Sequence, residues 1–200
     1  MSAPLTLLES ADLLGRYRYV ELAAFAALGE RARSCSDPAL ACYLAGASLA
    51  HGWRARQVEE RMPVSVGLLD VAACTRSPSP EVDEALALLA GPGDDADVLD
   101  GLLGALYPAM DEGYALRAVA ASPACDPPVV RLIGRLRCDI DAVRREGLAI
   151  AGRSGPARPG RRTDVGALLA RAGGAFGPLR ARSGRGDSGP SGRANISSPL

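Results

Sequence analysis

The chain has 200 residues, 48% of them hydrophobic and only 4% aromatic, which is typical of a folded, mainly helical protein. Its 23 basic residues, all arginines, balance 23 acidic ones, and its five cysteines form no CxxC pair. This composition excludes a disulfide-rich secreted scaffold and, because no run approaches about 18 apolar residues, a membrane-spanning helix. We expect a cytoplasmic location, since the N-terminus lacks the basic start of a secretory signal.

Helical periodicity predicts four long helices, with a long connection between the second and the third. Asp37 followed by Pro38 is a strong start signal, because aspartate caps free backbone N–H groups and proline fits the first turn. Pro108 lies inside the third helix and cannot donate to the carbonyl of Gly104, so we expect a kink there. The predicted helices span residues 10–33, 37–62, 97–122 and 126–151, and a short helix within the connection spans 79–91.

This layout predicts an all-α fold with the connectivity of a ferritin-like four-helix bundle. Short links join the first helix to the second and the third to the fourth, and a long crossover joins the two hairpins. We place this bundle at residues 1–152. After Gly152 the chain is rich in Gly, Arg, Ser and Pro, so we expect a disordered tail over 153–200 in which only Thr163–Ala172 could form a short helix.

The overall neutrality conceals an asymmetry between the bundle and the tail. Residues 1–152 contain 14 Arg against 21 Asp and Glu, whereas residues 153–200 contain 9 Arg against 2 Asp. A basic tail could contact RNA weakly through the phosphates. Because Phe176 is its only aromatic residue, we expect an electrostatic contact without base recognition.

Two polar residues lie on the apolar stripes of the first two predicted helices. His51, the only histidine, shares a helical face with Leu44 and Ala55, and Glu21 lies one turn after Tyr17. Because a short turn places the two helices side by side, we predict that the Glu21 and His51 side chains come within hydrogen-bond distance. The pair is either a buried hydrogen bond or part of an iron or manganese site.

Two segments carry a family resemblance: LLGRYRYVELAAFAALGERA (13–32) and ACYLAGASLAHGWRARQVEERMP (41–63). They resemble the bacterial ferritin-like proteins related to the tRNA-modifying di-iron hydroxylases, and the likeness continues more weakly over 97–151. The resemblance implies that each hairpin supplies a glutamate on its first helix and a Glu-x-x-His pair on its second. Glu21 and His51 match two of these positions.

The other positions depart from the family pattern. Ser48 stands three residues before His51, and serine is a poor ligand for a hard divalent metal. In the second hairpin Glu112 or Asp111 could supply the carboxylate of the third helix. The fourth helix has no histidine and offers Asp139, in its apolar stripe, or Asp141. The candidate metal ligands are therefore Glu21, His51, Glu112 and Asp139, against the six that a di-iron centre needs.

We therefore interpret the site as a degenerate di-iron site, with no cofactor expected and with iron or manganese as the metals it could hold. The expected function is a non-catalytic binding or assembly module, which could form a homo-oligomer. The alternative is an iron-dependent oxygenase or oxidase with an unusual ligand set. Trp53, Arg54 and Arg56, which follow His51, are expected on the outward, solvated side of the second helix.

Overall fold

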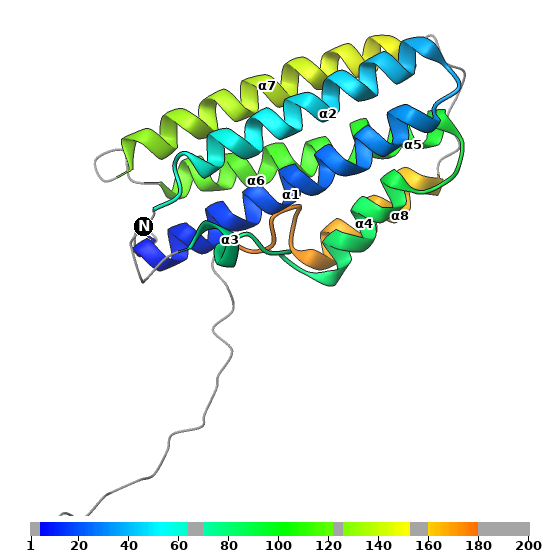
Figure 1. Cartoon of the computed structure of the whole chain (residues 1–200). Coiled ribbons are helices and arrows are strands. Elements are labelled where there is room, and N and C mark those ends of the chain that lie inside the picture. Colours follow the sequence, from blue (N-terminus) through cyan, green and yellow to red (C-terminus); the bar gives the residue numbers. More distant parts are fainter. Residues whose placement is uncertain (1–4, 64–69, 122–125, 153–159, 180–200) are drawn as a thin grey trace, which may run out of the picture.

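The computed structural model describes residues 5–63, 70–121, 126–152 and 160–179, and within these ranges the protein is all-helical (Figure 1). Two antiparallel pairs of long helices, α1 with α2 and α6 with α7, run along the molecule, and α2 also packs on α7. The long helices are α1 (Leu7–Ser34), α2 (Pro38–Glu59), α6 (Tyr107–Ala120) and α7 (Pro127–Ala151). The shorter ones are α3 (Val71–Cys74), α4 (Pro80–Ala90), α5 (Asp95–Gly101) and α8 (Gly160–Ala172).

The helix starts follow from local capping. The Asp37 carboxylate accepts from the backbone N–H groups of Ala39 at 2.8 Å and Leu40 at 3.3 Å, which confirms the predicted start of α2. Helix α1 begins about one turn earlier than predicted. The reason is a capping box in which Thr6 and Glu9 each accept from the other's backbone N–H.

A π-helical turn, Leu102–Leu106, joins α5 to α6 and lies where a kink was predicted. The Tyr107 N–H donates to the Leu102 carbonyl five residues back, so the helix continues through the position at which Pro108 has no donor. Beyond this turn the buried side chains of α6 include Tyr114 and Arg117. Leu116 on the same helix is exposed.

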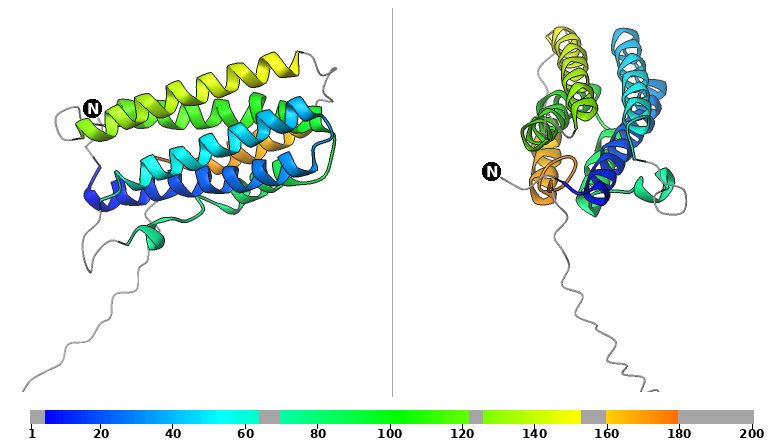
Figure 2. Two further views of the ribbon diagram at one scale, coloured as in Figure 1. Left: turned by 45° about the horizontal axis from the view of Figure 1, so that its top comes forward. Right: turned by 90° about the vertical axis from the view of Figure 1, so that its left-hand side faces the viewer.

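The folded body continues beyond the boundary predicted at Gly152, and that expectation is corrected. Helix α8 packs on α4, α5 and the π turn, with Val165, Leu168 and Leu169 buried. The right-hand view of Figure 2 shows α8 on the side of the bundle opposite α2. Residues 153–159 and 180–200 of the predicted tail lie outside the described residues.

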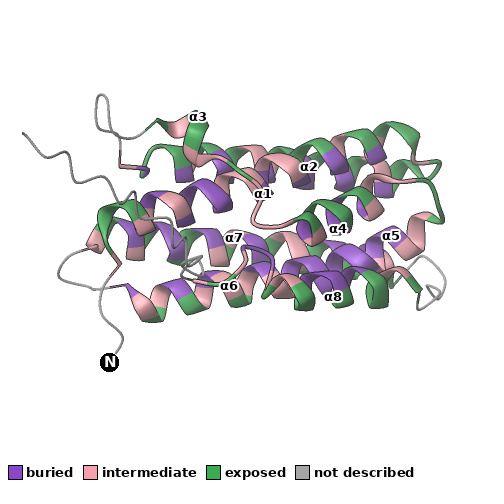
Figure 3. Ribbon diagram, turned by 90° about the horizontal axis from the view of Figure 1, so that it is seen from below, coloured by how far each residue is buried: buried purple, intermediate pink, exposed green. Residues whose placement is uncertain are grey.

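The segment after α8 turns back into the core. Phe176 is buried, with its ring 4.3 Å from that of Tyr17 and 4.7 Å from that of Tyr114, measured between centroids. The glycines that suggested disorder make this turn, because Gly174 has φ +104° and Gly177 has φ +67°. The burial pattern of the whole molecule is shown in Figure 3.

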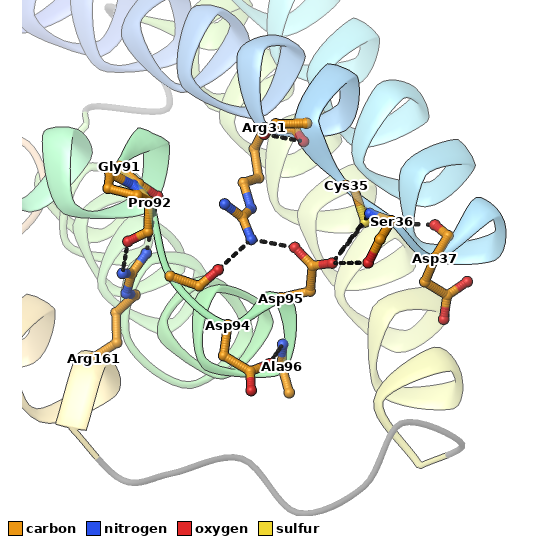
Figure 4. Close-up of polar contacts among 12 residues, drawn as sticks. Arg31, Cys35, Ser36, Asp37, Gly91, Pro92, Asp94, Asp95, Ala96 and Arg161 are labelled. Atoms are coloured by element: carbon orange, nitrogen blue, oxygen red, sulfur yellow. Dashed lines mark hydrogen bonds and ion pairs between the residues drawn. The ribbon is translucent and has the colours of Figure 1, made fainter.

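One end of the bundle is held by a group of polar contacts that we call the end cluster (Figure 4). Arg31 on α1 pairs with Asp95 and donates to the Gly93 carbonyl at 2.7 Å. Arg161 on α8 donates to the carbonyls of Leu88 and Pro92, each at 2.7 Å. Arginines from two distant parts of the chain thus hold the loop between α4 and α5.

None of the helices in the described ranges has the length and apolar character needed to cross a membrane.

Candidate functional site

The long helices bring a set of polar side chains together inside the bundle. Helices α1, α2, α6 and α7 each contribute at least one of them. Four of the side chains have 0% of their surface exposed: Glu21, His51, Arg54 and Tyr114. We call the set the core cluster. It consists of Glu21 on α1, His51 and Arg54 on α2, Tyr114 on α6 and Asp139 on α7.

Glu21 is the centre of the core cluster. Its Oε2 lies 2.6 Å from His51 Nδ1, so the predicted contact between these side chains is confirmed. The Tyr114 hydroxyl donates to Oε1 at 2.6 Å, and Arg54 Nε lies 3.0 and 3.1 Å from the two oxygens. The carboxylate thus meets donors from three side chains, which satisfies a buried acceptor.

Arg54 joins this carboxylate to a second one. Its Nη1 pairs with Asp139 on α7, so the guanidinium group lies between the acidic side chains of two helices. The prediction that Arg54 faces solvent is therefore wrong, whereas Trp53 and Arg56 are exposed as expected. Arg54 is three residues after His51, and this spacing places both side chains on the same buried face of α2.

The protonation states follow from burial and from these contacts. Burial alone would raise the pKa of Glu21, but Arg54 and His51 together hold it below its usual value. Burial lowers the pKa of His51, and the nearby Arg54 lowers it further despite the opposing effect of Glu21. For Arg54 the penalty of burial is outweighed by Glu21, which raises its pKa. Glu21 and Arg54 are therefore charged, and a neutral His51 donates from Nδ1.

The core cluster contains three of the four predicted metal ligands, Glu21, His51 and Asp139, but they are not arranged as ligands of one metal ion. Glu112 is exposed on α6 and is absent from the core cluster, and Asp139 meets Arg54 in place of another ligand. Ser48 donates to the Phe25 carbonyl at 2.7 Å, so its hydroxyl is bound to the backbone of α1. Over the ranges that the structure describes, no three His, Cys, Asp or Glu side chains are grouped so as to hold a metal ion.

The donor chemistry of the core cluster also disfavours a metal. Both oxygens of Glu21 lie against the cationic guanidinium of Arg54, where a metal cation would be repelled. His51 Nε2 is buried and has no hydrogen-bond partner among the described residues, but a single nitrogen does not make a metal site. The residues present do not fit a di-iron or di-manganese centre.

Two members of the core cluster were missed by sequence reasoning. Arg54 carried a positional signal, because it lies three residues after His51 and seven after Ala47 on the buried stripe. Tyr114 carried only a weak signal. Its face depends on the π turn that precedes α6, and the sequence pattern suggested a kink at that point.

No protein-family model matches the chain, and comparison with curated proteins and with solved structures gave no significant match. The resemblance to the ferritin-like proteins therefore remains a prediction from the sequence.

The described arginines of the predicted tail mostly contact the body of the protein. Arg161 donates to backbone carbonyls in the end cluster, and Arg162 lies 3.8 Å from Asp100. Arg171, on α8, is exposed. Weak RNA binding through the tail stays a prediction, and it depends largely on arginines outside the described residues.

Proposed function

We propose that this protein is a ferritin-like helical bundle in which an arginine replaces the metal, and that it acts as a non-catalytic binding or assembly module. The observation that carries the proposal is the position of Arg54, between the carboxylates of Glu21 and Asp139. In a carboxylate-rich bundle site the metal supplies the positive charge that the acidic side chains need. Here a guanidinium group supplies that charge and donates to both carboxylates.

The chemistry of the core cluster supports a structural role. Glu21 already accepts from three side chains, which leaves it poorly placed to remove a proton from a substrate. His51 has no exposed surface, so a substrate could reach its ring only if the helices separated. Arginine stays protonated at any physiological pH and cannot act as an acid or a base there.

The alternative, an iron-dependent oxygenase or oxidase, rests on the family positions of Glu21 and His51. It requires Arg54 to leave the core cluster and further carboxylates to enter it. Glu112, the predicted carboxylate of the third helix, is exposed. The observed geometry therefore favours the non-catalytic module.

Metal content tests the proposal directly. Wild-type protein is produced with added iron and manganese and purified without chelators, alongside Arg54→Ala and the matched control Arg56→Ala, which removes an exposed arginine of the same helix. We expect wild type and the control to be free of both metals. Arg54→Ala is expected to take up Mn²⁺, because its acidic side chains lack a compensating charge.

Metal bound to the wild-type protein would be the opposite result. Stoichiometric iron or manganese in the wild-type protein, lost in both Glu21→Gln and His51→Gln, would contradict the arginine-for-metal proposal. It would restore the oxygenase as the better account of the site.

A further inference from the structure

The outer face of α2 is apolar and exposed. Residues 38–53 contain no Asp, Glu or Arg, and residues 22–29 of the adjacent α1 contain none either. Three large side chains are exposed on this surface: Leu49 at 69%, Trp53 at 46% and Phe25 at 41%. The right-hand view of Figure 2 shows α2 at an outer edge of the bundle, and Figure 3 shows exposed residues along its length. We call this surface the α2 face.

The large side chains form one continuous surface. Leu49 and Trp53 are four residues apart and so lie one above the other on the helix. Phe25 reaches over from α1 against Gly52, where a Cβ would lie 3.2 Å from the Phe25 ring. A contiguous apolar patch of this kind, bordered by charged residues, marks an interaction surface.

The register of large and small residues on the α2 face suits pairing with a second copy of itself. Trp53 lies four residues after Leu49, and the small Ala45 lies four residues before it, next to Gly46. A Cβ added at Gly46 would meet nothing within 4 Å, so the surface there is open. In an antiparallel pair of α2 helices with a twofold axis at Leu49, the Trp53 ring of each copy falls on the small residues of the other.

The charges at the two ends of α2 fit the same arrangement. Arg61 lies twelve residues after Leu49 and Asp37 twelve residues before it, and both are exposed. Antiparallel pairing about Leu49 therefore brings each Arg61 towards Asp37 of the second copy. A parallel pairing would instead place like charges together, which disfavours it.

The size of the α2 face approaches what a dimer interface needs. The uncharged part of α2 is about 24 Å long at 1.5 Å per residue. With α1 beside it at the usual spacing of helices the surface is about 20 Å wide, which gives an area on the order of 500 Å². The charged rim adds to this and brings the total towards the roughly 800 Å² per partner of a stable interface.

We infer that the protein forms a symmetric, antiparallel homodimer through the α2 face, with Leu49 at the twofold axis. This inference deepens the assembly role proposed above. It depends on Phe25, Leu49 and Trp53 rather than on the core cluster, so a failure of one test leaves the other result standing.

The oligomeric state of the full chain gives the first test. Light scattering after size-exclusion chromatography at micromolar concentration should give the mass of a dimer. Leu49→Glu places two carboxylates at the axis and should raise the dissociation constant at least about 100-fold. The matched control is Val119→Glu, a change at a residue of α6 that is 87% exposed, and it should remain dimeric. Circular dichroism of both variants verifies that they fold.

Cross-linking gives the second test, which addresses the position of the axis. Leu49→Cys should form a disulfide-linked dimer under mild oxidation, because the two introduced residues face each other. The natural Cys42 is exposed but lies seven residues from the axis. Two copies of it would be about 21 Å apart along the helices. The wild-type protein should therefore not cross-link.

Three results would overturn the inference. A monomeric wild-type protein would show that the α2 face does not pair with itself. The surface would then be a binding site for a different protein. A Leu49→Glu variant that stays dimeric would place the interface elsewhere. A wild-type dimer cross-linked through Cys42 would show that the axis is not at Leu49.

Discussion

Arg54 in the core cluster and Arg31 in the end cluster each pair with a carboxylate from another helix, but their surroundings differ. Arg54 and Glu21 have no exposed surface at all, whereas Asp95, the partner of Arg31, is partly exposed. A broken pair at the end of the bundle can be rehydrated. A broken pair in the core leaves a charge in an apolar environment, which costs several kcal/mol.

The largest expected loss of stability comes from a truncation that removes contacts from both the core and the end cluster. Ending the chain after Gly152 removes Arg161 from the end cluster and the buried Leu168, Leu169 and Phe176 from the core, among others. Each such side chain contributes about 1.5–3 kcal/mol, so the loss approaches the whole stability of an ordinary domain. Thermal melting followed by circular dichroism should lose its cooperative transition.

Truncation after Leu179 is the control for that experiment. It retains every residue whose contacts are described, and it should melt as the full chain does. Unchanged cooperative melting after truncation at Gly152 would show that α8 contributes little to the fold.

Two matched substitutions test whether the buried arginine of the core cluster contributes more stability than the arginine of the end cluster. Arg54→Met leaves the Glu21 carboxylate buried without its countercharge and should lower the free energy of unfolding by about 3–5 kcal/mol. Arg31→Met should lower it by only about 1 kcal/mol, because water reaches Asp95. Urea unfolding of the two variants measures both values. Equal losses would mean that burial does not distinguish the two clusters.

Substitutions of His51 probe the core cluster without removing its charges. His51→Leu deprives Glu21 of one donor and should cost on the order of 1–3 kcal/mol. His51→Gln keeps a polar partner and should cost less. The same unfolding measurement applies, and a Gln variant as unstable as the Leu variant would argue against a hydrogen bond that stabilises the pair.

The smallest expected effect is a difference between the two clusters in how their contribution to stability depends on pH. Burial and Arg54 lower the pKa of His51 in the folded state, so between about pH 6.5 and that lower pKa the unfolded chain binds the additional proton. Stability should therefore begin to fall as the pH drops below about 6.5. At Asp95 burial raises the pKa, but the contacts with Cys35 and Arg31 outweigh burial and hold the pKa below its usual value. The stability that the end cluster contributes should therefore be lost only below about pH 4.

Midpoints of urea unfolding at several pH values measure this difference. In His51→Gln the loss of stability that begins near pH 6.5 should disappear, while the loss at lower pH should remain. A wild-type protein whose stability is constant between about pH 5 and 7 would contradict a neutral, buried His51.

The helices could be predicted from the sequence because their signals are local. Asp37 with Pro38 defines the start of α2, and the periodicity of the apolar residues places Glu21 and His51 inside the bundle. Their contact followed from the short turn between α1 and α2. Each of these inferences uses neighbours in sequence, which local capping and periodicity govern.

The remainder of the site could not be predicted because it depends on long-range compensation. Arginine is usually solvated, so the buried position of Arg54 becomes favourable only when Glu21 and Asp139, from two other helices, are both present. Glu112 was a reasonable candidate for a ligand, but it is exposed once the π turn has set the face of α6. The glycines near Phe176 are typical of a disordered linker, but in the structure they form a turn that places Phe176 against Tyr17 of α1.

The buried position of Phe176 also has a consequence for folding during synthesis. Its partners Arg16 and Tyr17 lie on the first helix, and the hydrogen bond from Arg16 to the Phe176 carbonyl spans 160 residues of chain. At the usual 5–20 residues per second, the first helix waits about 8–30 s on the ribosome for the segment that covers it. During that interval the nascent chain exposes an apolar surface, which would make it a substrate for chaperones.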